Sequence, residues 1–406
     1  MASADEADMS DSLRSIRSRF VLPEEVIYLD GNSLGVLPAG LSDRMNDVIE
    51  HQWGTRLVRG WNDAGWIDLP SQVAGKIAAL IGAETNCVAV GDSTSVNIFK
   101  VLSAALSLRP NRRVILSDRN NFPTDLYVAD GLTKLLGQGY ELKLATADTM
   151  EDAVDETVAA VLLTEVDYRT GERYDMLTMT KHIQKNGALA IWDLCHSAGA
   201  FPVNLDAAEA DFAIGCGYKY LNGGPGAPAF LYVAERHLAG VAPALSGWMG
   251  HKTPFAFTPD YLPAAGIHRM MVGTPPILSL SSLNIALDAF EDVDMTLVRQ
   301  KSQELCDRFI SEVERRCPEL ELVTPRAHER RGSQVSFRHP EGYAVMQALI
   351  ANGVIGDFRA PDILRFGMTP LYLRHADIQA AAEILERVMC EKLWDQEKYR
   401  KRAKVT

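Results

Sequence analysis

The chain has 406 residues, of which 47% are hydrophobic and 23% charged, an ordinary globular composition that excludes a disordered or collagen-like protein. A net charge of −12 opposes binding to nucleic acid or to an anionic membrane. No apolar run approaches the roughly 20 residues of a membrane-spanning helix, and the N-terminus is acidic and polar, so we expect a cytoplasmic protein. The six cysteines lack CxxC spacing, which predicts neither a disulfide framework nor a zinc site.

From about residue 70 onward, helical patterns alternate with short apolar runs bounded by turn residues. This alternation is typical of βα units on a mostly parallel sheet. The patterns predict helices over 69–83, 95–108, 121–139 and 176–187, strands over 87–92, 112–118, 159–166 and 188–194, and short apolar runs over 211–217 and 229–235.

After about Pro276 the pattern changes to one long helical stretch over 280–316, followed by several short strands and a last helix from about residue 376. This change indicates a separate α+β unit, which the N-terminal segment is expected to join. We therefore expect an α/β protein with a large domain over 45–280 and a small α+β domain formed by 1–44 and 281–406.

Ligands of open α/β sheets bind beyond the carboxyl ends of the strands, so the polar residues after each apolar run are the first candidates. Asp193 ends the run ALAIWD, where a carboxylate is costly without a cationic partner, although it could also cap a helix. Lys219 follows the run DFAIGCG, although such a lysine could simply be exposed. Together they match the needs of pyridoxal 5'-phosphate (PLP), which takes a lysine for its Schiff base and an acid at its pyridine nitrogen.

Two further segments could serve the same cofactor. Thr94 and Ser95 begin a predicted helix, where free N–H groups favour a phosphate, although this could be an ordinary helix cap. In NFPTD, the ring of Phe122 could stack on the cofactor, with Thr124 and Asp125 beside it, although Phe122 could instead be a hydrophobic staple.

These residues lie within stretches that resemble the kynureninase family, part of the aspartate-aminotransferase-like group of PLP enzymes. The resemblance covers nearly the whole chain in order, and CGYKYLNGGPG together with LSGWMGH is its most specific part. The matching stretches are YLDGNSLG, RGWNDAGW, TSVNIFKVLSAAL, NFPTDLY, IWDLCHSAGA, CGYKYLNGGPG, LSGWMGH, GTPPILSL and LRFGMTPLY.

The resemblance implies roles for individual residues. Lys219 would hold PLP and shuttle protons, and Tyr218 would be an acid/base in carbonyl hydration or, alternatively, a phenol bonded only to phosphate. Arg365 would bind the substrate α-carboxylate through its planar guanidinium. The cofactor-binding set it implies is Thr94, Ser95, Phe122, Thr124, Asp125, Thr164, Asp193, His196, Tyr218, Lys219, Trp248 and Thr274.

The implied reaction is the hydrolytic cleavage of the Cβ–Cγ bond of L-kynurenine to anthranilate and L-alanine, without a metal. The resemblance also implies a homodimer, in which Trp248 and Thr274 would complete the phosphate site across the interface. Ser33, Trp61 and Thr274 fall at positions that line the aryl pocket. Animal members that favour 3-hydroxykynurenine have histidine and asparagine in place of Trp61 and Thr274, so we expect a bacterial-type preference for unsubstituted kynurenine.

Two alternatives remain. A cysteine desulfurase or class V aminotransferase shares the fold and the aspartate–lysine pair, but a desulfurase needs a reactive cysteine on a mobile loop, and Cys306 and Cys317 lie in or near a predicted helix. A PLP-binding protein without turnover would lack a catalytic group, whereas Lys219, Tyr218 and Arg365 are all present.

Overall fold

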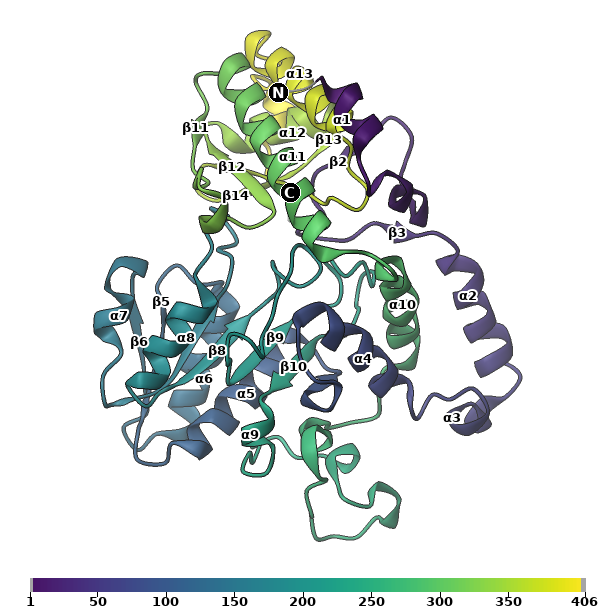
Figure 1. The fold of residues 1–406 in the computed structure, drawn as a ribbon, viewed down its shortest axis with the longest axis vertical. Helices are drawn as coiled ribbons and strands as arrows, with labels where there is room; N and C mark the ends of the chain where they lie inside the picture. The colour runs from purple at the N-terminus through teal and green to yellow at the C-terminus, as the bar shows by residue number, and fades with distance from the viewer. Residues whose placement is uncertain (1–2, 403–406) are drawn as a thin grey trace.

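A seven-stranded sheet, in the order β4-β10-β9-β8-β7-β5-β6, organises the lower part of the molecule in Figure 1. The computed structural model describes residues 3–402. Strands β5 to β9 pair in parallel, and only β10 runs antiparallel to its neighbours β9 and β4. β7 and β8 are buried along their whole length, as expected for continuous apolar runs in a parallel sheet covered on both faces. The strands are β4 Val88–Val90, β5 Val114–Asp118, β6 Glu141–Ala145, β7 Val158–Thr164, β8 Leu189–Asp193, β9 Phe212–Gly215 and β10 Phe230–Val233.

The helices between these strands pack on the sheet. α5 contacts four of the central strands, while α4 packs on β4 and α8 on β8. The mostly parallel sheet with helical crossovers confirms the α/β class, and β6 is a strand that the sequence patterns missed. The helices of this part are α2 Leu41–Asp47, α3 Gly60–Asp63, α4 Leu69–Ile81, α5 Thr94–Leu108, α6 Pro123–Leu136, α7 Met150–Ala153, α8 Met176–Lys185, α9 Glu235–Leu238 and α10 Ile277–Leu287.

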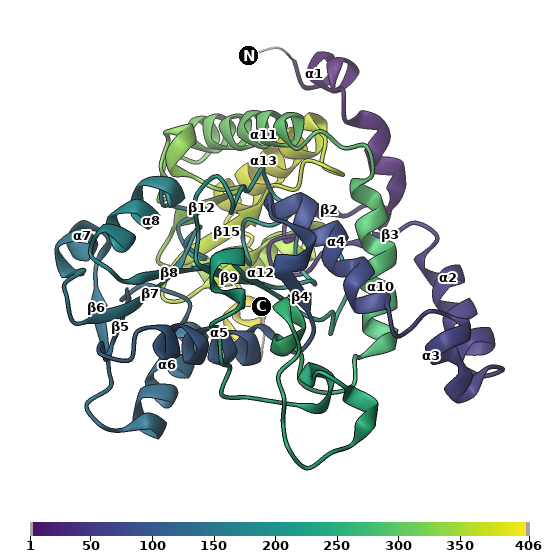
Figure 2. The same cartoon turned by 60° about the horizontal axis from the view of Figure 1, so that its bottom comes forward.

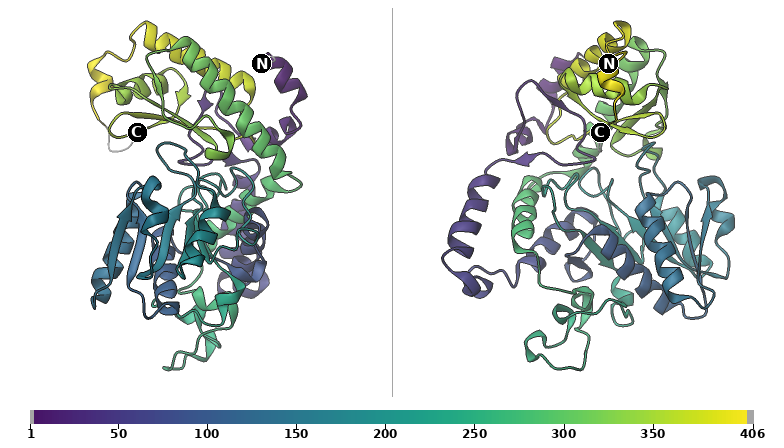
Figure 3. Two further views of the ribbon diagram at one scale, coloured as in Figure 1. Left: turned by 60° about the vertical axis from the view of Figure 1, so that its left-hand side comes forward. Right: turned by 180° about the vertical axis from the view of Figure 1, so that it is seen from behind.

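A second, antiparallel sheet lies above the first, with the loops at the strand ends between them (Figure 3, left). Its order is β11-β12-β15-β14. The N-terminal segment joins this part, because β2 pairs in parallel with β13 and α1 packs on α13. The elements are α1 Ala4–Ser10, β1 Phe20–Val21, β2 Ile27–Tyr28, β3 Leu37–Pro38, α11 Met295–Arg316, β11 Glu321–Leu322, β12 Gln334–Arg338, α12 Gly342–Ala351, β13 Val354–Ile355, β14 Asp357–Arg359, β15 Ile363–Gly367, α13 His375–Cys390 and α14 Glu397–Arg400.

The predicted helical stretch over 280–316 is helical for most of its length, but it is two helices rather than one. The chain forms α10, leaves the helix at residues 291–294, and starts again as α11. Asp292 takes a left-handed φ of +58°, which a helix interior does not allow, and the Asp294 side chain caps α11 by accepting a hydrogen bond from Thr296 N at 2.8 Å. A helical apolar pattern can continue through such a break, so periodicity alone misses it.

Two segments project from the body. Residues 41–66, with α2 and α3, form an arm on one side, and residues 241–276 form a loop-rich projection below the sheet (Figures 2 and 3). Both carry exposed apolar side chains: Trp53, Leu57 and Val58 on the arm, and Phe255 and Phe257 on the projection.

The division into 45–280 and 1–44 plus 281–406 stays a prediction. Its second boundary would fall inside α10, which packs on α4 and α2, so we propose moving that boundary to the turn at 291–294. Within residues 3–402, no helix is both long and apolar enough to cross a membrane.

Candidate active site

Lys219 and Asp193 lie at the same edge of the large sheet because β8 and β9 are parallel neighbours. Asp193 is the last residue of β8 and is 3% exposed, and Lys219 lies four residues beyond the end of β9. The Asp193 Oδ1 atom accepts a hydrogen bond from the backbone N–H of Cys195 at 2.7 Å. Lys219 Nζ lies 3.1 Å from His196 Nε2, which places a lysine and a histidine in direct contact at this edge.

A second carboxyl group lies against Asp193. Asp125, in the first turn of α6, is 1% exposed, and burial followed by the Asp193 carboxylate raises its pKa well above the ordinary value. Burial also raises the pKa of Asp193. The Asp125 Oδ2 atom is buried without a hydrogen-bond partner among the described residues. A cationic N–H group would satisfy this pair, and because the protonated pyridine nitrogen of PLP is such a group, the residues present fit the cofactor.

His196 is held as a neutral imidazole. Its side chain is buried, and burial together with the positive charge of Lys219 lowers its pKa well below the ordinary value. Its Nδ1 atom has no hydrogen-bond partner within residues 3–402. The neutral ring can therefore accept a hydrogen bond from the Lys219 ammonium group.

A cavity of about 760 Å³ opens beside this cluster. Its wall contains the start of α5, where Ser93 is the cap and accepts a hydrogen bond from Val96 N at 3.4 Å. Thr94 and Ser95 are therefore the first two helical residues. The helix cap is Ser93, so neither of them is the cap. Five of the expected residues line this cavity: Ser33, Thr94, Ser95, Tyr218 and Thr274.

An ion pair within the protein holds the turn before α5. Asp92 has a left-handed φ of +56° and lines the cavity, and Lys100, 2% exposed, forms an ion pair with it at 2.9 Å. Burial lowers the pKa of Lys100, which Asp92 partly offsets. The Lys100 ammonium group thus balances the charge of the Asp92 carboxylate at the cavity wall, so the N–H groups at the start of α5 remain available to an anion.

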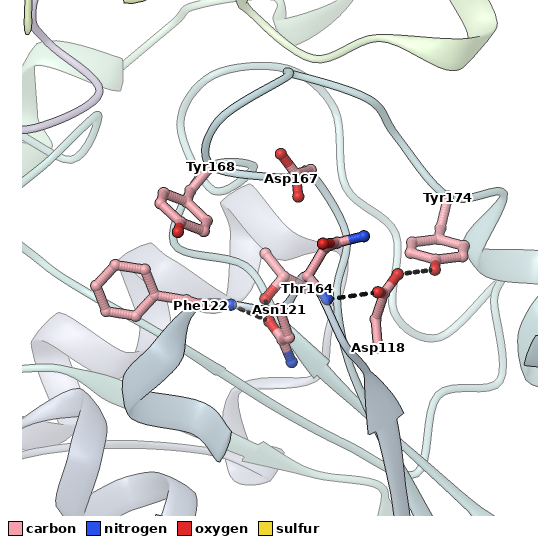
Figure 4. Close-up of a pocket in the computed structure, with 8 residues that line it drawn as sticks. Asp118, Asn121, Phe122, Thr164, Asp167, Tyr168 and Tyr174 are labelled. Atoms are coloured by element: carbon pink, nitrogen blue, oxygen red, sulfur yellow. Dashed lines mark hydrogen bonds between the residues drawn. The ribbon is translucent and has the colours of Figure 1, made fainter. Parts of the chain in front are cut away.

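Phe122 borders a second, much smaller pocket of about 20 Å³ (Figure 4). It precedes Pro123 at the start of α6. The residue is 40% exposed, and its ring meets the Tyr168 ring edge-on at 5.2 Å. Thr164, the last residue of β7, donates a hydrogen bond to the Asn121 side chain, which also accepts one from Phe122 N at 2.7 Å. Thr124 is half-buried beside them. The exposed ring is free to stack on a planar ligand, unlike a buried staple.

Arg365 lies on β15 at the face of the small sheet and is 1% exposed. Its Nε donates to Asp357 Oδ1 at 2.8 Å, and its second terminal nitrogen donates to Ser33 Oγ at 2.7 Å. Its first terminal nitrogen donates to the Tyr168 carbonyl at 2.6 Å, which ties the small sheet to the loop after β7. Because Ser33 lines the cavity, its hydrogen bond with Arg365 places this cation next to the cavity wall.

Trp61 and Trp248 are not brought to this cluster. Trp61 lies in α3 on the arm and packs edge-on against Trp66 at 5.9 Å. Trp248 lies on the projection, is 36% exposed, and contacts the rings of Phe255 and Phe257 at 5.6 and 6.2 Å. Neither lines the cavity or the pocket of Figure 4.

Sequence reasoning missed three polar residues of this region. Asn121 anchors Thr164 and Phe122, while Asp357 and Arg359 surround Arg365. The sequence contains a signal for each of them. Asn121 begins the NFPTD motif. Asp357 and Arg359 closely follow the apolar residues Val354 and Ile355 in VIGDFRAPDILRF.

Several known proteins are similar to this chain in sequence. The kynureninase C-terminal domain matches residues 298–385. A protein named kynureninase from Deinococcus radiodurans is 54% identical over 96% of this chain and 97% of its own length. Its counterparts from Pseudomonas fluorescens and Burkholderia mallei are 51% and 50% identical, each covering 98% of both chains.

Solved structures confirm the aspartate-aminotransferase-like fold. A cysteine desulfurase from Thermococcus onnurineus superposes with a TM-score of 0.78 at 20% identity, over 93% of this chain and 98% of that one. A cysteine desulfurase from Escherichia coli gives 0.75 at 17% identity, over 94% and 99%. At 17–20% identity, the likeness to the desulfurases shows only the fold. The proteins named kynureninase share half of their residues with this chain over nearly the full length, which shows the family. The chain belongs to the kynureninase family.

Proposed function

We propose that this chain is a PLP-dependent hydrolase that cleaves the Cβ–Cγ bond of L-kynurenine, giving anthranilate and L-alanine in tryptophan catabolism. One observation carries the proposal. Lys219 and His196 are in contact at the edge of the sheet where the buried carboxyl pair lies, which consists of Asp125 and Asp193. The relatives named kynureninase, at 50–54% identity over nearly the whole chain, support the choice of substrate.

The cofactor would be held by residues around the two cavities. Lys219 would carry it covalently, Asp193 and Asp125 would face the pyridine nitrogen, and Phe122 would stack on the ring. When bound, PLP would supply an electron sink that stabilises negative charge first at the substrate α-carbon and, after a proton shift, at the β-carbon released from the γ-carbonyl. The remaining proposed contacts are Thr124, Thr164 and His196 near the ring, and Thr94, Ser95, Tyr218, Trp248 and Thr274 at the phosphate.

Lys219 would move protons at the substrate. The neutral His196, 3.1 Å away, can accept a hydrogen bond from the ammonium form and so hold the amine in place between transfers. Burial raises the pKa of Tyr218, which keeps its phenol protonated at neutral pH. Tyr218 can therefore donate a proton to the γ-carbonyl oxygen as water adds, and Arg365 would bind the α-carboxylate.

Substrate preference would come from Ser33, Trp61 and Thr274. Ser33 and Thr274 line the large cavity. Trp61 lies outside the same chain's cavity, so its indole would fill the space that a 3-hydroxyl group needs only across the interface of the homodimer proposed below. We expect kcat/KM to be higher for L-kynurenine than for 3-hydroxykynurenine. A higher value for the hydroxylated substrate would contradict this assignment.

We further propose that the enzyme is a cytoplasmic homodimer. Support comes from the arm and the projection, which both have exposed apolar side chains. They also hold Trp61 and Trp248 away from the same chain's cavity. The six cysteines are free, which suits a reducing compartment. An active monomer in gel filtration at micromolar concentration would contradict the dimer.

The experiment that tests the function follows anthranilate fluorescence after L-kynurenine is added to the PLP-loaded protein. Release of anthranilate supports the proposal. Release of L-alanine from L-cysteine, without anthranilate from L-kynurenine, would instead support a desulfurase. The structure disfavours that alternative, because Cys306 and Cys317 are fully buried in α11 and at its end.

A further inference from the structure

A cluster of charged side chains lies where the small sheet meets the large cavity. It consists of Arg359 and Asp357 on β14, Arg365 on the neighbouring strand β15, and Asp30 and Ser33 after β2. Asp357 and Arg365 are direct partners in the antiparallel register, so their side chains point to the same face. Ser33 Oγ donates to Asp357 Oδ2 at 2.6 Å and also lines the cavity.

The donors of Arg365 are nearly all in use. A guanidinium has five N–H donors, and Arg365 makes four hydrogen bonds: two to Asp357, one to Ser33 and one to the Tyr168 carbonyl. Its side chain is 1% exposed. In this arrangement Arg365 has one donor left, whereas binding a carboxylate through both of its oxygens takes two donors.

Arg359 is placed differently. It donates through one terminal nitrogen to Asp357 Oδ2 at 2.6 Å and to Ser33 Oγ at 3.3 Å, and its remaining nitrogens make no hydrogen bond to the described residues. Its side chain is 32% exposed. The two guanidinium groups thus converge on Ser33 at the cavity wall, and both charges help to lower the pKa of His196 beside Lys219.

The cluster carries one positive charge in excess. Although burial disfavours its charge, Arg365 and Arg359 hold the pKa of Asp357 below the ordinary value, so it is ionised. Burial and the Asp357 carboxylate raise the pKa of Asp30 to about 8, so Asp30 is mostly neutral at pH 7. Two arginines face one ionised carboxylate, and a single additional anion would balance the cluster.

We propose that Arg359 is a second substrate-binding cation, which together with Arg365 holds the α-carboxylate of the amino-acid substrate, while Ser33 accepts a hydrogen bond from each guanidinium group and so positions both. Asp357 is the internal counter-ion that orients both guanidinium groups before the substrate arrives. This proposal rests on the proposed function for the identity of the substrate, but the amino-acid carboxylate that it recognises is common to L-kynurenine and to the product L-alanine.

The test compares Arg359→Gln, Arg359→Lys and a matched control, Arg338→Gln. Arg338 lies on β12 of the same sheet, is 41% exposed, and pairs with Glu321 at 2.7 Å. For each PLP-loaded protein we would measure kcat and KM for L-kynurenine, the dissociation constant of L-alanine by calorimetry, and the inhibition constant of 2-aminoacetophenone, an aryl ketone without a carboxylate. Thermal unfolding and PLP absorbance verify that each variant is folded.

For Arg359→Gln we expect KM and the L-alanine dissociation constant to rise about tenfold, as for loss of one charge-assisted hydrogen bond at a partly exposed site. The expected change in kcat is less than about threefold and that for 2-aminoacetophenone less than about twofold. Arg359→Lys keeps the charge without the planar fork and should lie between the wild type and Arg359→Gln. Arg338→Gln should match the wild type.

Two results would overturn the proposal: unchanged binding of L-alanine and L-kynurenine in Arg359→Gln, or equal weakening of 2-aminoacetophenone, which would indicate a structural role. If Arg359→Gln does not fold, unchanged L-alanine binding in Arg359→Lys overturns it equally. If the wild type binds L-alanine but releases no anthranilate, the proposed function fails, and the L-alanine measurements still decide the role of Arg359.

Discussion

Replacing Asp30 with Asn should make the protein more stable, and increasingly so as the pH rises. Asp30 follows β2, and its Oδ1 atom is buried without a hydrogen-bond partner among the described residues. Burial and the neighbouring Asp357 carboxylate raise its pKa from 3.8 to about 8. The charged and titratable groups that face it are Tyr28, Asp357, Arg359, Arg365, Tyr220 and Tyr372.

The sign follows from proton binding. Between pH 4 and pH 8 the folded protein holds a proton on Asp30 that the unfolded chain has released, so unfolding releases a proton and stability falls as the pH rises. The slope is at most about 1.4 kcal/mol per pH unit, and the full window gives a ceiling of about 6 kcal/mol. Water entry and local movement would relieve part of this penalty, so we expect roughly half of it.

The assay compares thermal unfolding midpoints of wild type and Asp30→Asn at pH 5, 6, 7 and 8, at equal protein and PLP concentrations. A chain of this length unfolds with an entropy of about 0.85 kcal/mol/K, so the full slope corresponds to roughly 1.6 °C per pH unit. We expect the Tm difference in favour of Asp30→Asn to grow by about 1 °C per unit between pH 5 and pH 7.

Asp148→Asn, which removes an exposed carboxyl group in the large α/β part, is the matched control and should run parallel to the wild type. Parallel pH profiles for Asp30→Asn and the wild type would refute the reasoning. They would show that Asp30 is ionised in the folded protein and that the cluster around Arg365 carries no excess charge.

Three further substitutions test the cofactor site. Lys219→Ala should abolish the absorbance band of covalently held PLP and all anthranilate release, and a persistent band would show that another lysine carries the cofactor. Asp193→Asn should lower kcat by at least about a hundredfold, because it removes the charge that keeps the pyridine nitrogen protonated; a kcat within tenfold of wild type would contradict that role. Phe122→Ala should raise the PLP dissociation constant about threefold to tenfold in equilibrium dialysis, since the ring of this 40% exposed residue adds only stacking, and an unchanged constant would argue against stacking.

Much of the site followed from sequence because it depends on strand ends. Parallel strands bring their carboxyl ends to one edge, so Asp193 after one apolar run and Lys219 after another could be expected to meet. A helix start at Thr94 was also predicted, and α6 begins at Pro123, two residues after the predicted start at 121.

The rest depends on contacts that no local pattern encodes. Asp357 meets Arg365 only through the register of β14 and β15, and both meet Ser33 only because β2 joins the small part of the molecule beside β13. The neutral state of Asp30 arises from this assembly. Apolar periodicity did not reveal the break between α10 and α11, because the apolar pattern continues on both sides of the Asp294 cap.

The most direct test of the central claim is to run the reaction of L-kynurenine in water enriched in oxygen-18 and to identify both products by mass spectrometry. Hydrolytic Cβ–Cγ cleavage adds a water oxygen to the γ-carbonyl carbon. The account therefore predicts equal amounts of anthranilate and L-alanine, with oxygen-18 in the anthranilate carboxylate at every turnover. Anthranilate without the label, or no anthranilate from the PLP-loaded protein, would contradict it.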